Sequence, residues 1–217
     1  MPLTPIEVRV LGSLIEKQVT TPEYYPLTLN ALTLACNQKN NRNPVSSFTE
    51  AEVDQALDSL RDKNLAYVFH GSTSRVPKYK HVMPEIFQLS PAELAVMCVL
   101  MLSGAQTVGE IRTRGYRLYE FASLEEVEQT LHSLSTKDEP LVMKLPRQPG
   151  QKEARFANLL SGEVNVEQLA KEQPARKPTH RVSDSDRVKK LEEQVENLAA
   201  EVESLRQQFE VFKKQFE

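Results

Sequence analysis

Two stretches of this chain repeat each other, and the repeat constrains the fold more than any other feature. Leu3–Val8 (LTPIEV) matches Leu89–Leu94 (LSPAEL) at an offset of 86, and Thr49–Leu60 matches Ser123–Leu134 at an offset of 74. The falling offset means that the first copy has a longer loop between its second and third helices, at Asn37–Pro44. The duplication indicates one supersecondary unit used twice.

Helix starts are marked by five Ser or Thr residues that are followed three positions later by Glu, each ahead of an apolar helical pattern. This spacing fits a capping box, in which the hydroxyl and the carboxylate accept from backbone N–H groups that open a helix. Two of the boxes carry Pro at the first helical position, where its missing N–H costs nothing. The five boxes are Thr4–Glu7, Thr49–Glu52, Ser90–Glu93, Thr107–Glu110 and Ser123–Glu126.

Each copy is predicted to contain three helices and then two short strands. In the first copy we expect helices over about Pro5–Lys17, Leu27–Cys36 and Glu50–Lys63, and strands at Leu65–Phe69 and within Val76–Met83. The second copy repeats this, with strands at Leu141–Leu145 and Ala154–Phe156. Three helices closed by a β-hairpin are the winged-helix arrangement, and each copy is long enough for its own modest core.

The end of the chain has a different pattern. Apolar residues alternate by three and four, as in the a and d positions of a coiled coil. They are Val188, Leu191, Val195, Leu198, Val202, Leu205, Phe209, Phe212 and Phe216. Valine at a and leucine at d favour a parallel dimer, and the alternative is a helix that packs back on its own winged helices.

The predicted fold class is therefore mainly α with small β-hairpins (α+β). We expect two tandem winged-helix domains, at residues 1–84 and 85–160. A polar linker over 161–184 and a coiled-coil helix over 185–217 follow.

Composition limits the possible functions. No leader pattern and no run of about 18 apolar residues is found, so we expect a cytoplasmic protein without a membrane partner. Cys36 and Cys98 lie in separate apolar stretches and predict buried free thiols, and the four histidines show no ligand spacing. Because phosphate-binding glycine loops and nucleophile motifs are also missing from the sequence, we expect no enzyme, no catalytic residue, no metal and no cofactor.

The charge pattern argues both for and against DNA binding. The predicted third helix of the first copy has five acids against two cations over residues 49–63, so it would repel phosphates if it entered a DNA groove. Cations gather instead in the long loop, the wings and the second copy's middle helix, where they suit phosphate contacts. These candidates are Lys39, Arg42, Arg75, Lys78, Lys80, Arg112, Arg114, Arg117, Arg147, Lys152 and Arg155.

Several stretches resemble the bacterial YceH family. They include Leu11–Gln18, Tyr25–Leu32, Ala35–Lys39 and Arg117–Phe121, and the match covers roughly residues 3–160. The resemblance implies tandem winged-helix domains and no established activity, since the family is described as uncharacterised.

Two functions remain open from the sequence. The first is DNA association or transcriptional regulation through wing and loop cations, by a dimer whose coil sets the half-site spacing. The second is a protein-interaction adaptor that uses its acidic third helices and does not contact DNA. Lys17, Gln18, Asn30 and Gln38 form a possible recognition surface whose residue types suit either partner.

Overall fold

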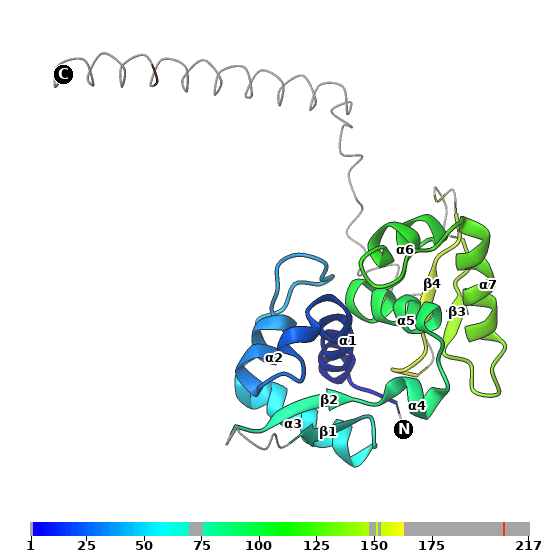
Figure 1. Cartoon of the computed structure of the whole chain (residues 1–217). Coiled ribbons are helices and arrows are strands. Elements are labelled where there is room, and N and C mark those ends of the chain that lie inside the picture. Colours follow the sequence, from blue (N-terminus) through cyan, green and yellow to red (C-terminus); the bar gives the residue numbers. More distant parts are fainter. Residues whose placement is uncertain (1, 70–75, 148–150, 152, 163–205, 207–217) are drawn as a thin grey trace. The chain divides into compact units, whose positions relative to one another are not determined.

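The protein is mainly helical, with two small antiparallel hairpins (Figure 1). The computed structural model describes residues 2–69, 76–147, 151, 153–162 and 206. Residues 1–170 form one compact unit. Apart from Arg206, the predicted coiled coil lies outside the described residues, and so does nearly all of the predicted linker. Among the described residues, no helix is long and apolar enough to span a membrane.

The first copy of the repeat contains the expected three helices and hairpin. A single 3-10 turn, η1 (Pro22–Tyr24), and a short helix after the hairpin were not predicted. The elements are α1 (Pro5–Thr20), α2 (Leu29–Cys36), α3 (Glu50–Asp62), β1 (Ala66–Phe69), β2 (Lys78–His81) and α4 (Met83–Phe87). The predicted domain boundary after residue 84 falls inside α4.

The second copy has the same order of elements. They are α5 (Pro91–Ser103), α6 (Val108–Gly115), α7 (Leu124–Ser135), β3 (Val142–Lys144) and β4 (Phe156–Asn158). A further bridge closes each hairpin on its own helices: Leu27 pairs with Tyr79 in the first copy, and Gln106 with Phe156 in the second. In each copy, therefore, one residue between the first two helices pairs through its backbone with the second strand of the hairpin.

The helix starts follow the predicted capping chemistry. Reciprocal boxes open α1, α3, α5 and α6. At α7 the Ser123 hydroxyl accepts from the Glu126 N–H at 3.2 Å, but the Glu126 carboxylate turns elsewhere. It accepts from the Ala122 N–H at 2.7 Å and from the Tyr119 hydroxyl at 3.0 Å. The fifth box is therefore only half formed, because a tyrosine competes for its carboxylate.

An ion pair is repeated along with the helices. Glu7 on α1 binds Lys63 just after α3, with 2.5 Å between Oε1 and Nζ. At offsets of 86 and 74, Glu93 on α5 lies 3.5 Å from Lys137 just after α7, and it also accepts from Ser133. Both carboxylates are buried. Each pair thus connects the start of one helix to the end of another in the same copy.

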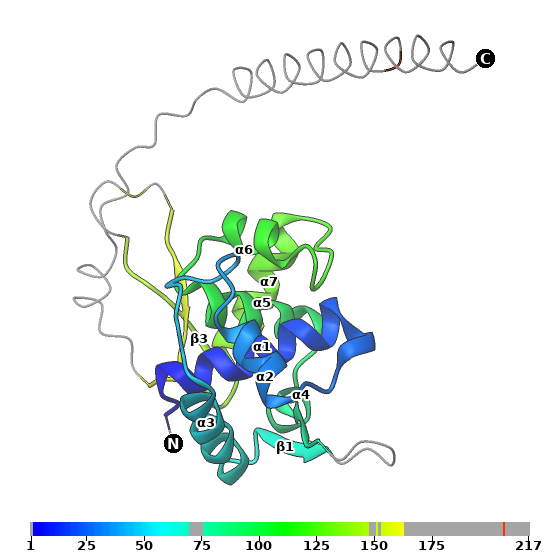
Figure 2. The same cartoon turned by 90° about the vertical axis from the view of Figure 1, so that its left-hand side faces the viewer.

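The two copies meet through α1 and α5, which pack against each other at the centre of the unit (Figure 1). Their fully buried side chains include Leu11, Leu14, Met97 and Leu100, and a single hydrophobic cluster extends through both copies. The hairpins lie on different sides of this helix pair in both views (Figures 1 and 2). The unit is therefore joined through a shared core.

Each copy's loop after its second helix reaches the other copy's first helix. The Asn43 N–H donates to the Leu102 carbonyl at the end of α5, at 2.9 Å. In the opposite direction, Arg117 approaches Glu16 near the end of α1, with 3.8 Å between Nη2 and Oε1. The extra length of the first loop thus helps to hold the two copies together.

Candidate nucleic-acid interface

The solvent-facing side of the first hairpin carries two aromatic rings and two lysines. Tyr67 and Phe69 alternate with inward residues on β1, and their side chains remain 39% and 42% exposed. Lys78 and Lys80 alternate in the same way on β2. We call these four residues the first-hairpin face. The strand register places Tyr67 opposite Lys80 and Phe69 opposite Lys78.

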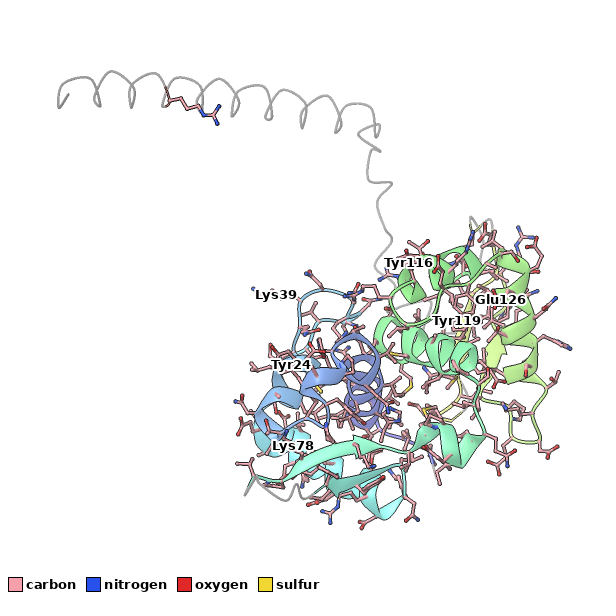
Figure 3. The ribbon with its side chains drawn as sticks, viewed as in Figure 1. Tyr24, Lys39, Lys78, Tyr116, Tyr119 and Glu126 are labelled. Carbon is pink, nitrogen blue, oxygen red and sulfur yellow. The ribbon has the colours of Figure 1, made fainter. Side chains whose placement is uncertain are left out.

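The ring and the ammonium group of one cross-strand pair are in contact. Nζ of Lys80 lies 4.4 Å from the centroid of the Tyr67 ring, which is a cation–π distance. Figure 3 shows Lys78 at the first copy's hairpin, well separated in that view from Glu126 on the second copy. The outer surface of this hairpin therefore combines apolar rings with positive charge.

The inner side anchors the hairpin to the helices. The His81 backbone N–H donates to the Tyr25 hydroxyl at 2.9 Å, and the His81 ring nitrogen Nε2 lies 2.6 Å from Oε1 of Gln18. Burial lowers the pKa of His81 to about 4, with Glu85 acting weakly in the opposite direction, and burial raises the pKa of Tyr25. A neutral histidine and a protonated tyrosine thus fix β2 at neutral pH.

The segment that carries this face contains cations and no acids. Residues 63–84 contain no Asp or Glu, although the chain as a whole has a net charge of −3. Among the described residues, neither Lys78 nor Lys80 forms a salt bridge with a carboxylate. Arg75, a third cation predicted for this surface, lies outside the described residues. The first-hairpin face therefore carries positive charge, although the protein as a whole is negatively charged.

The long loop contributes one exposed cation instead of two. Lys39 is exposed and projects away from the helices (Figure 3). Arg42 was predicted to contact nucleic acid, but its side chain is 0% exposed. Its guanidinium pairs with Glu16 at 2.6 and 3.2 Å and donates to the Ala35 carbonyl at the end of α2. This corrects the prediction for Arg42. The residue is buried, where it caps the end of α2 and pairs with Glu16.

Two of the second copy's candidate cations have partners within the protein, although Arg112 is exposed. Arg155 binds the Glu110 carboxylate at 2.7 and 3.1 Å and also donates to the Ala105 carbonyl. Arg112 donates to the carbonyls of Phe121 and Ala122.

The remaining second-copy candidates differ in position. Arg117 stays 58% exposed beside Glu16, and Arg114 is half-buried on α6. Arg147 is exposed after β3 and interacts with a neighbour, while Lys152 lies outside the described residues. These cations do not reproduce the cross-strand lysine–aromatic pairs of the first hairpin.

The possible recognition surface is divided among different neighbours. Gln18 binds His81, Asn30 donates to Glu50 at 3.0 Å, and Gln38 accepts from Arg42 at 3.3 Å. Lys17 is half-buried in the last turn of α1. Each of the three amides thus has a structural partner.

The third helices present acids to solvent. On α3 the residues Glu50, Glu52, Asp58 and Asp62 are exposed, and Asp58 pairs with Arg61 at 2.8 Å. On α7 both Glu125 and Glu128 are exposed. The acidity read from the sequence therefore lies on the surface of both helices.

Within the described part of the chain, no group of three or more His, Cys, Asp and Glu side chains is arranged to hold a metal. Cys36 and Cys98 are buried free thiols, as predicted, and burial raises the pKa of each. These thiols are therefore protonated near neutral pH and unsuited to nucleophilic chemistry.

The sequence interpretation missed the aromatic half of the first-hairpin face. It identified Lys78 and Lys80 but treated Tyr67 and Phe69 only as β-prone residues. The signal was present, because alternate residues of a strand share one face and a short hairpin places them opposite alternate residues of the next strand.

Comparison with known proteins places this internally duplicated, mainly helical chain in a bacterial family without a known function. Residues 3–151 match the family model described as "Protein of unknown function, DUF480". A UPF0502 protein of Citrifermentans bemidjiense is 52% identical over 189 residues, covering 87% of this chain and 86% of the relative.

Two further UPF0502 proteins match as closely. That of Geotalea daltonii is 51% identical, covering 88% of each chain, and that of Opitutus terrae is 52% identical, covering 89% of this chain and 81% of the relative. The chain belongs to this family, which confirms the resemblance noted in the sequence.

Proposed function

We propose that this protein is a non-enzymatic, DNA-associated protein built from two tandem winged-helix domains, in which the first-hairpin face is the main DNA contact. A role as a transcriptional regulator would follow from such binding. The winged-helix assignment is supported by the order of elements, in which three helices, a bridging residue and a two-stranded hairpin occur twice. One topology serves many functions in different proteins, so the function is derived from the site.

The observation that carries the DNA proposal is the positive charge of the first-hairpin face. Lys78 and Lys80 have no carboxylate partner among the described residues, whereas Arg42 and Arg155 are held in ion pairs. Unpaired lysines release counterions when they neutralise phosphates, and this release drives DNA association. Contact through a hairpin also keeps phosphates away from the acidic third helices, so binding is expected to show little base readout.

Dimerisation is proposed through the C-terminal heptads. The alternating apolar residues between Val188 and Phe212 support a two-stranded coil. Sedimentation equilibrium of the intact chain should give a dimer, and the double variant Val195→Asp, Leu198→Asp should give a monomer. A monomeric wild-type protein would contradict this part of the proposal.

The DNA proposal is tested by fluorescence anisotropy with a labelled duplex at about 50 and 200 mM salt, a range over which several phosphate contacts separate clearly. We expect binding at the lower salt and a steep loss at the higher. Absence of binding at the lower salt would refute direct DNA association by this protein.

The exposed acids of α3 and α7 favour a second candidate function, that of a protein-interaction adaptor. It predicts that the intact protein binds a Lys/Arg-rich polypeptide through α3 and fails to bind duplex DNA. The double variant Asp58→Asn, Asp62→Asn should then weaken polypeptide binding, while Glu125→Gln on α7 serves as the comparison. Equal affinities of wild type and all variants would remove the acidic helices from any interface.

A further inference from the structure

Phosphate binding alone does not explain the aromatic residues of the first-hairpin face. Tyr67 and Phe69 are large rings that stay 39% and 42% exposed, although their strand neighbours Ala66 and Val68 turn inward. Duplex DNA needs only cations on its backbone, because its bases are already stacked and paired. Exposed rings next to lysines are instead the combination used by proteins that bind single strands, where rings stack on bases and cations follow the phosphates.

From this arrangement we infer that the first-hairpin face is a stacking platform for the unpaired bases of single-stranded DNA. The inference rests on the proposed DNA association and specifies the form of DNA that this face prefers. Tyr67 and Phe69 supply the aromatic surfaces, and Lys78 and Lys80 hold the adjacent phosphates.

The spacing of the rings favours an unstacked strand. Tyr67 and Phe69 are two residues apart on β1, so their Cα atoms are separated by about 7 Å, the repeat of one strand face. This is roughly twice the 3.4 Å step between stacked bases along one DNA strand. A strand that touches both rings must therefore be splayed, which is cheap for a flexible single strand and costly for a duplex.

The lysines leave the rings accessible. Nζ of Lys80 lies 4.4 Å from the centroid of the Tyr67 ring, and Tyr67 stays 39% exposed, so part of its surface is open to a base. The same ammonium lies beside the stacking position, where a phosphate of the bound strand would balance its charge. Because residues 63–84 contain no acid, a strand along this hairpin meets no like charge from that segment. Charge complementarity thus selects a polyanion over an apolar peptide.

The second hairpin provides an internal comparison. There Lys144 lies opposite Phe156, with Nζ 6.0 Å from the ring centroid. Phe156 bridges to Gln106 as Tyr79 bridges to Leu27, so this pair occupies the positions of Val68 and Tyr79 in the first hairpin and not those of Tyr67 and Lys80. Phe156 is half-buried, and the positions equivalent to Tyr67 and Lys80 are occupied by Met143 and Ala157. The second hairpin therefore lacks the two-ring platform, and its lysine serves as a control.

The test uses the intact protein and labelled strands of about 16 nucleotides, the upper range for one binding module. Four probes are compared by anisotropy: a single DNA strand, an abasic strand of equal length, the matching duplex, and an RNA strand of the same sequence. The abasic strand keeps every phosphate and removes every base, so it isolates stacking without altering the protein.

Three results are expected. The single strand binds more tightly than the duplex and the RNA, and the abasic strand binds at least about fivefold more weakly than the normal one, as loss of one stacked base implies. Tyr67→Leu and Phe69→Leu, which keep apolar bulk but remove the ring, each weaken single-strand binding by a similar factor and leave duplex binding unchanged. Tyr116→Leu, at a ring that is 65% exposed on the second copy, has no effect. Thermal unfolding verifies that each variant is folded.

Other outcomes separate this inference from the function on which it rests. Equal affinity for normal and abasic strands, or tighter binding of the duplex, overturns the stacking platform and leaves DNA association standing. Tighter binding of RNA overturns the assignment to DNA. No binding of any probe at about 50 mM salt, where phosphate contacts are strong, overturns both the platform and the proposed function.

Discussion

Cys98 on α5 donates its thiol hydrogen to the backbone carbonyl of Gly12 on α1, with Sγ and O 3.5 Å apart. These two residues occupy the same position in the two copies, since 98 minus 12 equals the repeat offset of 86. The copies therefore meet at equivalent points, as the subunits of a symmetric dimer do. The contact is reciprocal: Gly12 faces Leu102, and Glu16, at the position equivalent to Leu102, acts electrostatically on Cys98.

A side chain at position 12 should separate the two copies. A Cβ on Gly12 would lie 3.0 Å from Cδ2 of Leu102 and 3.2 Å from Cβ of Met101, an atom that cannot move without the α5 backbone. We predict that Gly12→Val lowers the free energy of unfolding by about 1–3 kcal/mol, the usual cost of overpacking. Urea unfolding measures this.

The control for this substitution is Gly109 on α6, where an added Cβ meets nothing within 4 Å. Gly109→Ala should raise stability by about 0.5–1 kcal/mol, because alanine favours the helix over glycine. If Gly12→Val is as stable as wild type, the close approach of α1 and α5 is not as described.

The Glu16–Arg42 ion pair should be essential for stability. Both side chains are buried, at 7% and 0% exposure, so removing the carboxylate leaves an uncompensated guanidinium in the interior. We predict that Glu16→Gln lowers the free energy of unfolding by about 3–5 kcal/mol. Asp58→Asn, which breaks an exposed pair with Arg61, should change it by less than about 1 kcal/mol. Equal effects of the two substitutions in urea unfolding would contradict a buried pair.

His81 should make stability depend on pH below neutrality. Its ring is buried, and Nδ1 accepts a hydrogen bond from the Met83 N–H at 3.4 Å. Protonation of Nδ1 would therefore place its hydrogen against the Met83 amide hydrogen. Because its pKa falls from 6.5 when unfolded to about 4 when folded, the unfolded state binds the proton first as pH drops. Its contribution is complete above pH 6.5 and declines towards pH 4.

We predict that wild type loses about 1.6 kcal/mol more than His81→Gln between pH 6.5 and 5, because the slope reaches about 1.4 kcal/mol per pH unit only well below pH 6.5. His132→Gln, at an exposed position on α7, is the matched substitution for comparison. Urea unfolding at several pH values provides the comparison, and parallel profiles for wild type and His81→Gln would refute a buried neutral histidine.

The sequence predicted the elements well where local chemistry determines them. The Thr4, Thr49, Ser90 and Thr107 boxes open helices as expected, because the cap and its glutamate are three residues apart and need no distant partner. At Ser123 the prediction was incomplete, since the competing Tyr119 hydroxyl comes from the preceding loop.

Tertiary packing was harder to predict. Arg42 follows a run of turn-forming residues, and such a cation is usually solvated, so nothing local revealed that the long loop folds it onto Glu16 and the end of α2. The packing of α1 on α5 likewise depends on a glycine that looks neutral in the sequence and matters only because Leu102 lies against it. The aromatic half of the first-hairpin face could have been found, because strand alternation and cross-strand register suffice to place it.

The most direct test of the account is the salt dependence of duplex DNA binding by the double variant Lys78→Gln, Lys80→Gln. If these lysines neutralise phosphates, the slope of log K against log salt should become shallower by about 2, roughly one for each lysine. Lys144→Gln, at an exposed lysine that lies near a ring in the second hairpin, should leave the slope unchanged. An unchanged slope for the double variant would show that the first hairpin does not contact duplex DNA.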